Sequence, residues 1–311
     1  MAFTSSFTFT HPITIADDPE FDVTPSATVA ISSAIADGAS PGDLVKTNGG
    51  TLLLSAVNSY TGTTTVQAGT LRMGVANALS TATAVTVDAG ALFDLASFSQ
   101  SIGSLAGAGS VTLGSATLTT GNDSTSTSYA GSIGGSGGLT KIGSGTFTLS
   151  GTSSYSGPTA VSGGSLDVEG SIANSLVAVA NGGRLVGAGT VGSLLVAGGG
   201  ILAPGAITPF TTLNVSGNAT FASGAIFQVA VNPAGQTDRL AVAGAATLQG
   251  GTVQVRAATG SYTQASRFAI LTAAGGVSGT FAGFSVNQSF AFLTPQITYS
   301  MTRTIPFSAS R

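Results

Sequence analysis

The 311-residue sequence contains no cysteine and a single histidine, and only 7% of its residues are charged. The lack of cysteine excludes disulfides, thiolate metal sites and cysteine nucleophiles. Ordinary soluble domains carry roughly 25% charged residues. The net charge is −3 and the basic residues form no run. Nucleic acid and anionic lipid surfaces are therefore not expected partners, because binding them requires a basic patch.

Long apolar runs are also missing. No stretch approaches the 18 or more apolar residues of a membrane-spanning helix. The first residues lack the basic region and apolar core of a signal peptide, so a secreted parent would contain this sequence as a mature or excised piece. Hydrophobic residues still make up 42% of the chain, which argues against a disordered protein.

The most informative feature that is present is an internal repeat. Leu44–Gly74 and Leu139–Gly170 align without a gap at an offset of 95 residues, and over the first 28 aligned positions 13 are identical. The identical positions include Lys46 with Lys141 and Tyr60 with Tyr155. Self-similarity of this kind predicts a stacked repeat architecture.

A smaller pattern recurs about every 20 residues: an apolar β-branched residue, two residues, a glycine, one residue, and another apolar residue. It begins at Val66, Val87, Val161 and Val196. We interpret it as a strand, a tight turn in which glycine accepts a positive φ, and a second strand. About 20 residues, at roughly 3.3 Å each, form three short strands with corners. The sequence thus predicts an all-β fold, a parallel β-helix (solenoid), right-handed because crossovers between parallel strands are.

Composition divides the chain into three expected regions. Residues 1–43 are read as an N-terminal strand with loops that cover the first coil, and residues 44–200 as β-helix repeats. Residues 201–311 are read as a C-terminal β-helix ending in a cap-like region. Aromatic residues gather near the end, and their large apolar area predicts that this third is the most stable part.

Three stretches resemble bacterial autotransporter passenger domains. LTKIGSGTFTLSGTSSYSGPTAVSGGSLDV resembles the passenger-associated repeat, and the run from Gly198 to Gly251 looks like a passenger segment. RFAILTAAGGVSGTFAGF followed by FLTPQITYS resembles the pertactin-like, or autochaperone, region that ends many passengers. The resemblance covers about residues 44–300.

This resemblance implies a type V secretion passenger carried through the outer membrane by a translocator β-barrel and displayed at the cell surface or released. The barrel is expected as a partner outside these residues, since no barrel-like strands follow here. We expect a monomeric, non-enzymatic, adhesin-like scaffold without cofactors, whose host-surface or glycan ligand is unknown. The autochaperone-like region would drive vectorial folding through its aromatic residues, namely Tyr262, Phe268, Phe281, Phe284, Phe292 and Tyr299.

Several motifs were weighed as chemical sites. The acidic cluster Asp17, Asp18, Glu20 and Asp22 lacks the spacing of a calcium loop and is read as a solvated loop. Asp167 and Glu169 alternate on one strand and are expected on its outer face. Paired carboxylates cleave glycans in some enzymes, so a β-helix polysaccharide-degrading enzyme stays an alternative, as does a surface or phage fibre.

Two glycine-rich stretches match motifs of catalytic or nucleotide sites. Gly134–Gly138 has the form of a nucleophile elbow, and Gly187–Gly192 that of a dinucleotide fingerprint. Both motifs require a following helix, and no helical pattern follows either stretch, so both are interpreted as turns. Tyr60 and Tyr155 lie beside glycine turns and are expected to pack in corners rather than stack on sugars.

Overall fold

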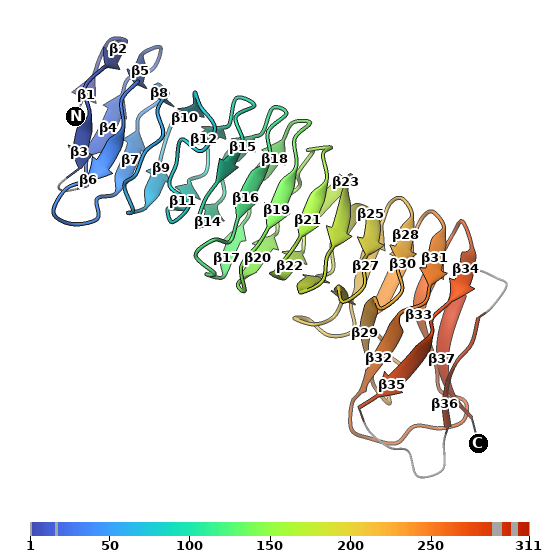
Figure 1. The fold of residues 1–311 in the computed structure, drawn as a ribbon. Coiled ribbons are helices and arrows are strands. Elements are labelled where there is room, and N and C mark those ends of the chain that lie inside the picture. Colours follow the sequence, from blue (N-terminus) through green and yellow to red (C-terminus); the bar gives the residue numbers. More distant parts are fainter. Residues whose placement is uncertain (1, 16–17, 288–293, 300–303, 311) are drawn as a thin grey trace. The chain divides into compact units, whose positions relative to one another are not determined.

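The computed structural model describes residues 2–15, 18–287, 294–299 and 304–310. Every regular element within them is a β-strand (Figure 1), which confirms the all-β prediction. The chain forms two compact units, residues 1–159 and 160–311. Within the described ranges no helix is long and apolar enough to cross a membrane.

The first unit is a stack of parallel strands, each coil contributing one strand to each of several sheets. The first sheet contains β1 (Ala2–Phe3), β4 (Glu20–Val23), β7 (Leu44–Thr47), β9 (Thr64–Val66), β11 (Ala84–Val87), β14 (Ser104–Gly107), β17 (Thr127–Tyr129) and β20 (Thr146–Leu149). The second contains β2 (Phe7–Phe9), β5 (Thr28–Ile31), β8 (Thr51–Leu54), β10 (Thr70–Met73), β12 (Leu92–Asp94), β15 (Ser110–Thr112) and β18 (Ser132–Gly134). The third side is formed by the pair β3 (Ile13–Ile15) and β6 (Ile35–Asp37), and by β13 (Gln100–Ser101), β16 (Leu118–Thr120) and β19 (Leu139–Lys141).

The core of this unit consists of columns in which equivalent residues of successive coils lie on one another. In the second sheet one fully buried column runs along the strands in register: Val29, Leu52, Leu71, Phe93, Val111 and Ile133. Burial of each such side chain contributes about 1.5–3 kcal/mol. A single coil cannot bury this face, so the stack is the folding unit, as the repeat predicted.

Residues 2–37 are more regular than the sequence indicated. Instead of one strand followed by loops, they form β1 to β6, and these strands pair in parallel with the coils that follow. The N-terminal segment is therefore already part of the stack. Whether it also acts as a cap stays a prediction.

The second unit continues the parallel pattern with longer strands. One sheet contains β22 (Gly164–Val168), β24 (Gly183–Val186), β26 (Ile201–Ala203), β29 (Ile226–Val231), β32 (Thr252–Ala257) and β35 (Gly283–Val286). The other contains β23 (Ser171–Val179), β25 (Thr190–Val196), β27 (Thr212–Val215), β30 (Arg239–Val242) and β33 (Arg267–Ala273), with the side branch β28 (Ala219–Phe221), β31 (Ala246–Gln249) and β34 (Val277–Thr280). The remaining strand, β21 (Thr159–Val161), contains the boundary between the units.

In the sheet that contains β33, parallel pairing ends at that strand, whereas β34 and β35 still pair in parallel with β31 and β32. Strand β37 (Thr304–Ser310) pairs antiparallel with β33, and β36 (Thr294–Ile297) pairs antiparallel with β37. An antiparallel hairpin on β33 changes the pairing pattern that another coil would copy on this sheet, which is one way to protect a sheet edge. The parallel solenoid is thus confirmed, while its right-handedness and a capping role of the C-terminal hairpin stay predictions.

The recurring glycine pattern forms the predicted turns. The glycine of each copy has a positive φ between two strands: Gly69 (70°), Gly90 (87°), Gly164 (59°) and Gly199 (79°). At Gly69 a Cβ atom would lie 2.4 Å from the carbonyl oxygens of Asn48 and Gly50. Glycine is therefore required there both by backbone conformation and by the close approach of the preceding coil.

The two long repeats share a buried lysine. Lys46 lies in the inward column between Phe21 and Val66 and is 0% exposed. Its Nζ donates to the carbonyls of Thr47 (2.7 Å), Asn48 (2.7 Å) and Ala68 (3.0 Å). These acceptors lie at corners of two successive coils, so the ammonium ties one coil to the next. Burial lowers the pKa of Lys46 to about 8.

Lys141 repeats this arrangement in the second copy. It is 1% exposed, and its Nζ donates to Ile142 O at 2.6 Å and Gly143 O at 3.1 Å. However, Lys46 lies on β7 in the first sheet, whereas Lys141 lies on β19 in the third. The repeat therefore specifies a local corner of two coils and not a fixed face of the solenoid.

The repeat tyrosines also occupy equivalent sites, and the predicted corner packing is confirmed. Tyr60 and Tyr155 are both 0% exposed. Each hydroxyl lies 2.6 Å from a threonine Oγ1 four residues later, Thr64 or Thr159. A buried phenol with its hydroxyl satisfied is a stable core group, so these tyrosines offer no surface for stacking on sugars.

Replacing the buried lysines tests their role. Lys46→Met and Lys141→Met should each lower the free energy of unfolding by about 1–3 kcal/mol, because the corner carbonyls lose a charged donor. Arg72→Met is the matched control, since its ion pair is largely exposed and worth at most about 1 kcal/mol. Urea unfolding measures all three. Equal, small losses would show that the lysines do not hold the coils together.

The buried tyrosines predict a loss of stability in alkali. Burial raises the pKa of Tyr60 and Tyr129 above the ordinary value of 10. Above that pH the unfolded chain releases the phenol protons while the folded chain retains them, so the free energy of unfolding falls as pH rises. Lys46 has the opposite effect between about pH 8 and its ordinary pKa of 10.5. In this range the unfolded chain binds a proton that the folded chain has lost, so the free energy of unfolding rises with pH.

Thermal unfolding from pH 7 to 11.5 checks these two effects. Tyr60→Phe and Tyr129→Phe should flatten the fall above pH 10, and Lys46→Met should reduce the rise that begins near pH 8, part of which Lys141 supplies because burial lowers its pKa too. A fall of the same slope in both phenylalanine variants and the wild type would contradict the assignment to these tyrosines.

Candidate functional site

The predicted folding residues are divided among several places. Phe281 is 7% exposed and packs on Phe221 at 5.3 Å and Phe227 at 6.2 Å between ring centroids. Phe221 and Phe227 also contact each other at 5.5 Å. This three-ring core includes two residues that the sequence analysis did not select, although Phe227 follows the strict alternation of Ala225–Val231 that indicates an inward position.

A second aromatic pair joins Tyr262 to Phe268. Their ring centroids are 6.1 Å apart in an edge-to-face arrangement, and Phe268 is 3% exposed. The Tyr262 hydroxyl donates to Val231 O at 3.1 Å and Ala258 O at 3.0 Å. The tyrosine thereby fastens the loop after β32 to the end of β29.

The remaining predicted residues lie nearer the surface. Phe284 is 38% exposed and Tyr299 is 40% exposed. The Tyr299 hydroxyl accepts a hydrogen bond from the Phe281 amide at 2.9 Å, which connects it to the three-ring core. Phe292 lies outside the described residues. The set is therefore partly a core and partly a surface, and its role in folding stays a prediction.

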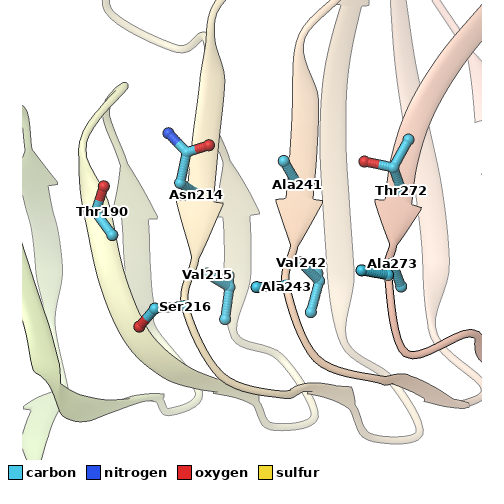
Figure 2. Close-up of a pocket in the computed structure, with 10 residues that line it drawn as sticks. Thr190, Asn214, Val215, Ser216, Ala241, Val242, Ala243, Thr272 and Ala273 are labelled. Carbon is cyan, nitrogen blue, oxygen red and sulfur yellow. The ribbon is translucent and has the colours of Figure 1, made fainter.

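A groove of about 480 Å³ lies along the outer side of β25, β27, β30 and β33 (Figure 2). Thr190, Asn214, Ala241 and Thr272 lie opposite one another on these four strands in continuous register, and form a row of small polar and apolar side chains. The groove is lined by Thr190, Asn214, Val215, Ser216, Ala241, Val242, Ala243, Thr272, Ala273 and Ala274.

The chemistry of this groove is neutral. None of its lining residues is ionisable, so it contains no titratable side chain that could act as a general acid or a general base. Ser216 Oγ already donates to main-chain carbonyls, the nearest being Ala173 O at 3.1 Å. Small side chains leave space above the strands, and the groove can hold an extended neutral ligand but cannot supply proton transfer.

The carboxylate pair is arranged differently from the prediction. Asp167 was expected on the outer face with Glu169, but it is 3% exposed while Glu169 is exposed. The strict alternation fails because three successive residues at the end of β22, Leu166 to Val168, are all buried. Burial and the neighbouring Asp167 raise the pKa of Glu169. Neither carboxylate lines the groove.

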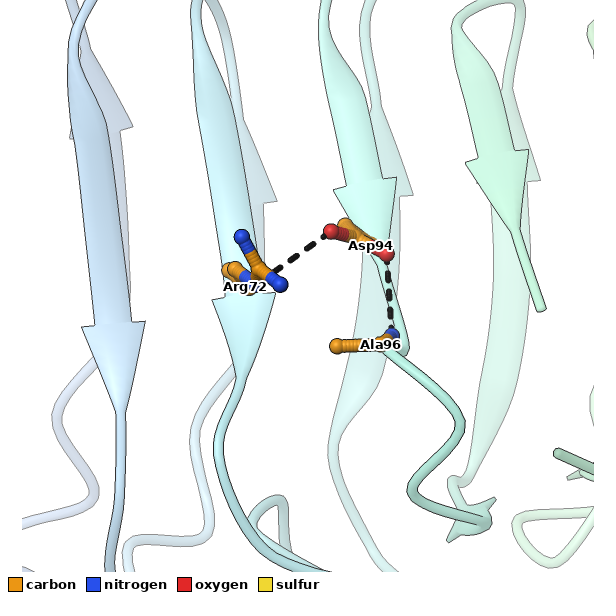
Figure 3. Close-up of polar contacts among 3 residues, drawn as sticks. All are labelled: Arg72, Asp94 and Ala96. Atoms are coloured by element: carbon orange, nitrogen blue, oxygen red, sulfur yellow. Dashed lines mark hydrogen bonds and ion pairs between the residues drawn. The ribbon is translucent and has the colours of Figure 1, made fainter. Parts of the chain in front are cut away.

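The repeat equivalent of Asp167 is Arg72, which lies on the surface. Its Nε is 3.5 Å from Asp94 Oδ2 on the neighbouring strand, and Asp94 Oδ1 accepts the Ala96 amide at 2.9 Å (Figure 3). The Arg72 side chain is 54% exposed, so this pair contributes little to stability. The two copies thus differ at the position that would carry catalysis.

The glycine motifs are turns, as interpreted. Gly134–Gly138 connects β18 to β19, and Ser136 Oγ donates to Gly114 O at 3.2 Å. Of the motif Gly187–Gly192, residues 187–189 form the turn between β24 and β25, and residues 190–192 already belong to β25. The single histidine, His11, is exposed and its Nδ1 lies 3.3 Å from Thr10 Oγ1. Among the described residues no group of histidine and carboxylate side chains is arranged to hold a metal ion.

Comparison with known proteins identifies the repeat. Residues 44–73 and 139–168 match the passenger-associated-transport-repeat, and these are the segments that contain the buried lysines and tyrosines. This confirms the resemblance to autotransporter passenger domains, which are displayed at the bacterial surface or secreted.

Two relatives show the breadth of the family. The chain is 35% identical over 181 residues to an extracellular serine protease of Serratia marcescens, an alignment that covers 55% of this chain and 17% of that protein. It is 46% identical over 123 residues to the adhesin BmaC autotransporter of Brucella suis biovar 1 (strain 1330), which covers 37% of this chain and 4% of that protein. The chain thus spans less than a fifth of either relative.

Two phenylalanines of the predicted set provide a matched test. Phe281→Ala should lower the free energy of unfolding by about 3–5 kcal/mol, because it removes one ring of the three-ring core. Phe284→Ala should cost much less, since its side chain is already 38% exposed. Chemical denaturation measures both. Similar losses would mean that Phe284 is also a core residue.

Proposed function

We propose that this chain is a non-enzymatic, adhesin-like passenger scaffold, displayed at the outer membrane or released from it. The observation that carries the proposal is the pair of passenger repeats, each built around a buried lysine and a buried tyrosine that serve structure. The similarity to an adhesin over 37% of this chain supports the same reading.

The surface is suited to contact rather than chemistry. The groove on β25, β27, β30 and β33 has hydroxyl, amide and methyl groups but no titratable side chain. An adhesive surface of this kind recognises a ligand through shape and neutral hydrogen bonds. A hydrolytic site would require a nucleophile or water activated by a base.

One relative suggests a protease as the alternative function, and a protease would require a catalytic site. A serine nucleophile needs a histidine base within hydrogen-bond reach. His11, the histidine of this chain, contacts Thr10 and, through its carbonyl, accepts a hydrogen bond from Ser33 Oγ. These contacts do not place the imidazole of His11 between a serine hydroxyl and a carboxylate, which is the arrangement that a serine protease requires.

Binding and hydrolysis assays on the purified chain distinguish these functions. We expect saturable binding to host epithelial cells or matrix, and no hydrolysis of casein or of acidic glycans such as pectin. Hydrolysis that is lost in a His11→Ala variant would establish an enzyme. A chain that neither binds nor cleaves would contradict an adhesin-like role and leave a display scaffold.

We further propose that the C-terminal segment starts folding. It contains the three-ring core around Phe281, the Tyr262–Phe268 pair and the antiparallel hairpin that ends the stack. A stable end can template the coil before it, and a solenoid then grows coil by coil. In secretion this order would give vectorial folding outside the cell.

Truncation tests that order. A chain ending at residue 261 should refold at least about tenfold more slowly than the full chain, or not at all, because no preformed coil is available for templating. The control removes residues 1–37 from the other end, a shorter terminal segment that forms β1 to β6. Refolding after dilution from urea, followed by far-UV circular dichroism, gives both rates. Equal slowing by both truncations would contradict a special role of the C-terminus.

A further inference from the structure

The second unit contains a small polar pocket apart from the groove. It measures about 120 Å³ and lies on the outer side of β24, β26, β29 and β32. Its cationic and amide side chains come from three of these strands, namely Arg184 from β24, Gln228 from β29 and Arg256 from β32, and the carboxylate Asp238 lines it as well. Ala203 and Ala230 also line it, and their small side chains leave the space between the longer ones open.

Two guanidinium groups meet in this pocket. Arg184 Nη2 is 3.1 Å from Gln228 Oε1, and Arg256 Nη2 is 3.5 Å from the same oxygen. Gln254 Oε1 accepts the Gln228 amide at 2.8 Å and so fixes which end of Gln228 faces the arginines. One neutral oxygen is therefore shared between two cations, which repel each other. This neighbour, together with burial, lowers the pKa of Arg184.

Neither arginine has a carboxylate partner among the described residues, where the ion pair joins Arg72 to Asp94. Arg184 Nε is buried without a hydrogen-bond acceptor. Asp238 also lines the pocket, but its oxygens accept the main-chain amides of Phe210 at 2.6 Å and Ala230 at 2.7 Å. Arg184 is half-buried and Arg256 is exposed, and the two guanidinium groups together present more hydrogen-bond donors than the pocket supplies acceptors.

We propose that the Arg184–Arg256 pocket binds one oxoanionic group, a sulfate or a carboxylate, such as those of acidic glycans. Such a group supplies several acceptor oxygens and a compensating charge, which two planar guanidinium forks match well. The volume fits one such group and not a whole sugar ring, so a glycan would be held by its charged substituent.

The distribution of charge along the chain favours an anion here. Nine of the twelve acidic residues lie in residues 1–159, whereas six of the nine basic residues lie in residues 160–311. The second unit therefore does not repel anions as the first unit does. This inference is independent of the proposed function, since an anion site can exist in an adhesin, an enzyme or a scaffold.

Isothermal titration calorimetry with small probes tests the site. The probes are glucose 6-sulfate, glucuronate, sodium sulfate and, as the neutral control, glucose, all at constant ionic strength. We expect saturable binding of one equivalent of at least one charged probe, and none of glucose. Comparison of glucose 6-sulfate with glucuronate shows whether the preferred source is a sulfated or a uronic sugar.

The variants Arg184→Gln and Arg256→Gln should each weaken binding by at least about tenfold, the effect of losing one charged hydrogen-bond donor. Arg239→Gln, which removes the same charge from the same unit outside the pocket, should bind as the wild type does. Equal weakening in all three variants would show general charge attraction and overturn the proposal. Absence of saturable binding by every charged probe to a folded wild-type chain would overturn it as well.

Discussion

Each coil of this chain leaves an apolar inner face and rows of backbone donors and acceptors unsatisfied until another coil lies on it. The buried column from Val29 to Ile133 and the parallel pairing in register are two results of that constraint. Backbone groups must find partners when they are buried, and here the partners come from the coil before and the coil after. The composition follows: small residues and glycines at the corners, β-branched and leucine residues inside, and few charges.

The buried lysines show how a polar group can serve such a stack. A corner presents several carbonyl oxygens that no strand amide reaches. An ammonium at the end of a flexible apolar stem can pass through the core and satisfy these oxygens in two coils at once. Asn58 and Ser153, also repeat equivalents, do a related task by accepting the main-chain amides of Ile35 and Ile133. Together, the lysines, the tyrosines and these two residues satisfy the polar groups of a corner, so the repeat specifies the corner structure.

Much of this fold could be predicted from the sequence, because its signals are local. The glycine pattern determined the turns, the alternation gave the inward residues, and the offset of 95 residues revealed the repeat. The role of Lys46 was missed, although the signal was present: it is identical in both copies and occupies an inward position between Leu44 and the strand end. Asp167 was placed on the wrong side because alternation breaks at the end of β22.

The candidate sites were less accessible to sequence reasoning. The groove depends on the register of four strands, and the Arg184–Arg256 pocket joins residues 72 positions apart. No local motif encodes such a meeting, since each arginine alone looks like an ordinary solvated side chain. The aromatic segment was recognised by its composition, but its partners Phe221 and Phe227 come from earlier coils.

Equivalent strands of the two repeat copies lie in different sheets of the solenoid, β7 in the first sheet and β19 in the third. A duplicated segment need not preserve its rotational position about the axis, because it carries its own corner, glycine and lysine. We therefore expect the stack to accept a duplicated pair of coils at more than one rotational position about its axis.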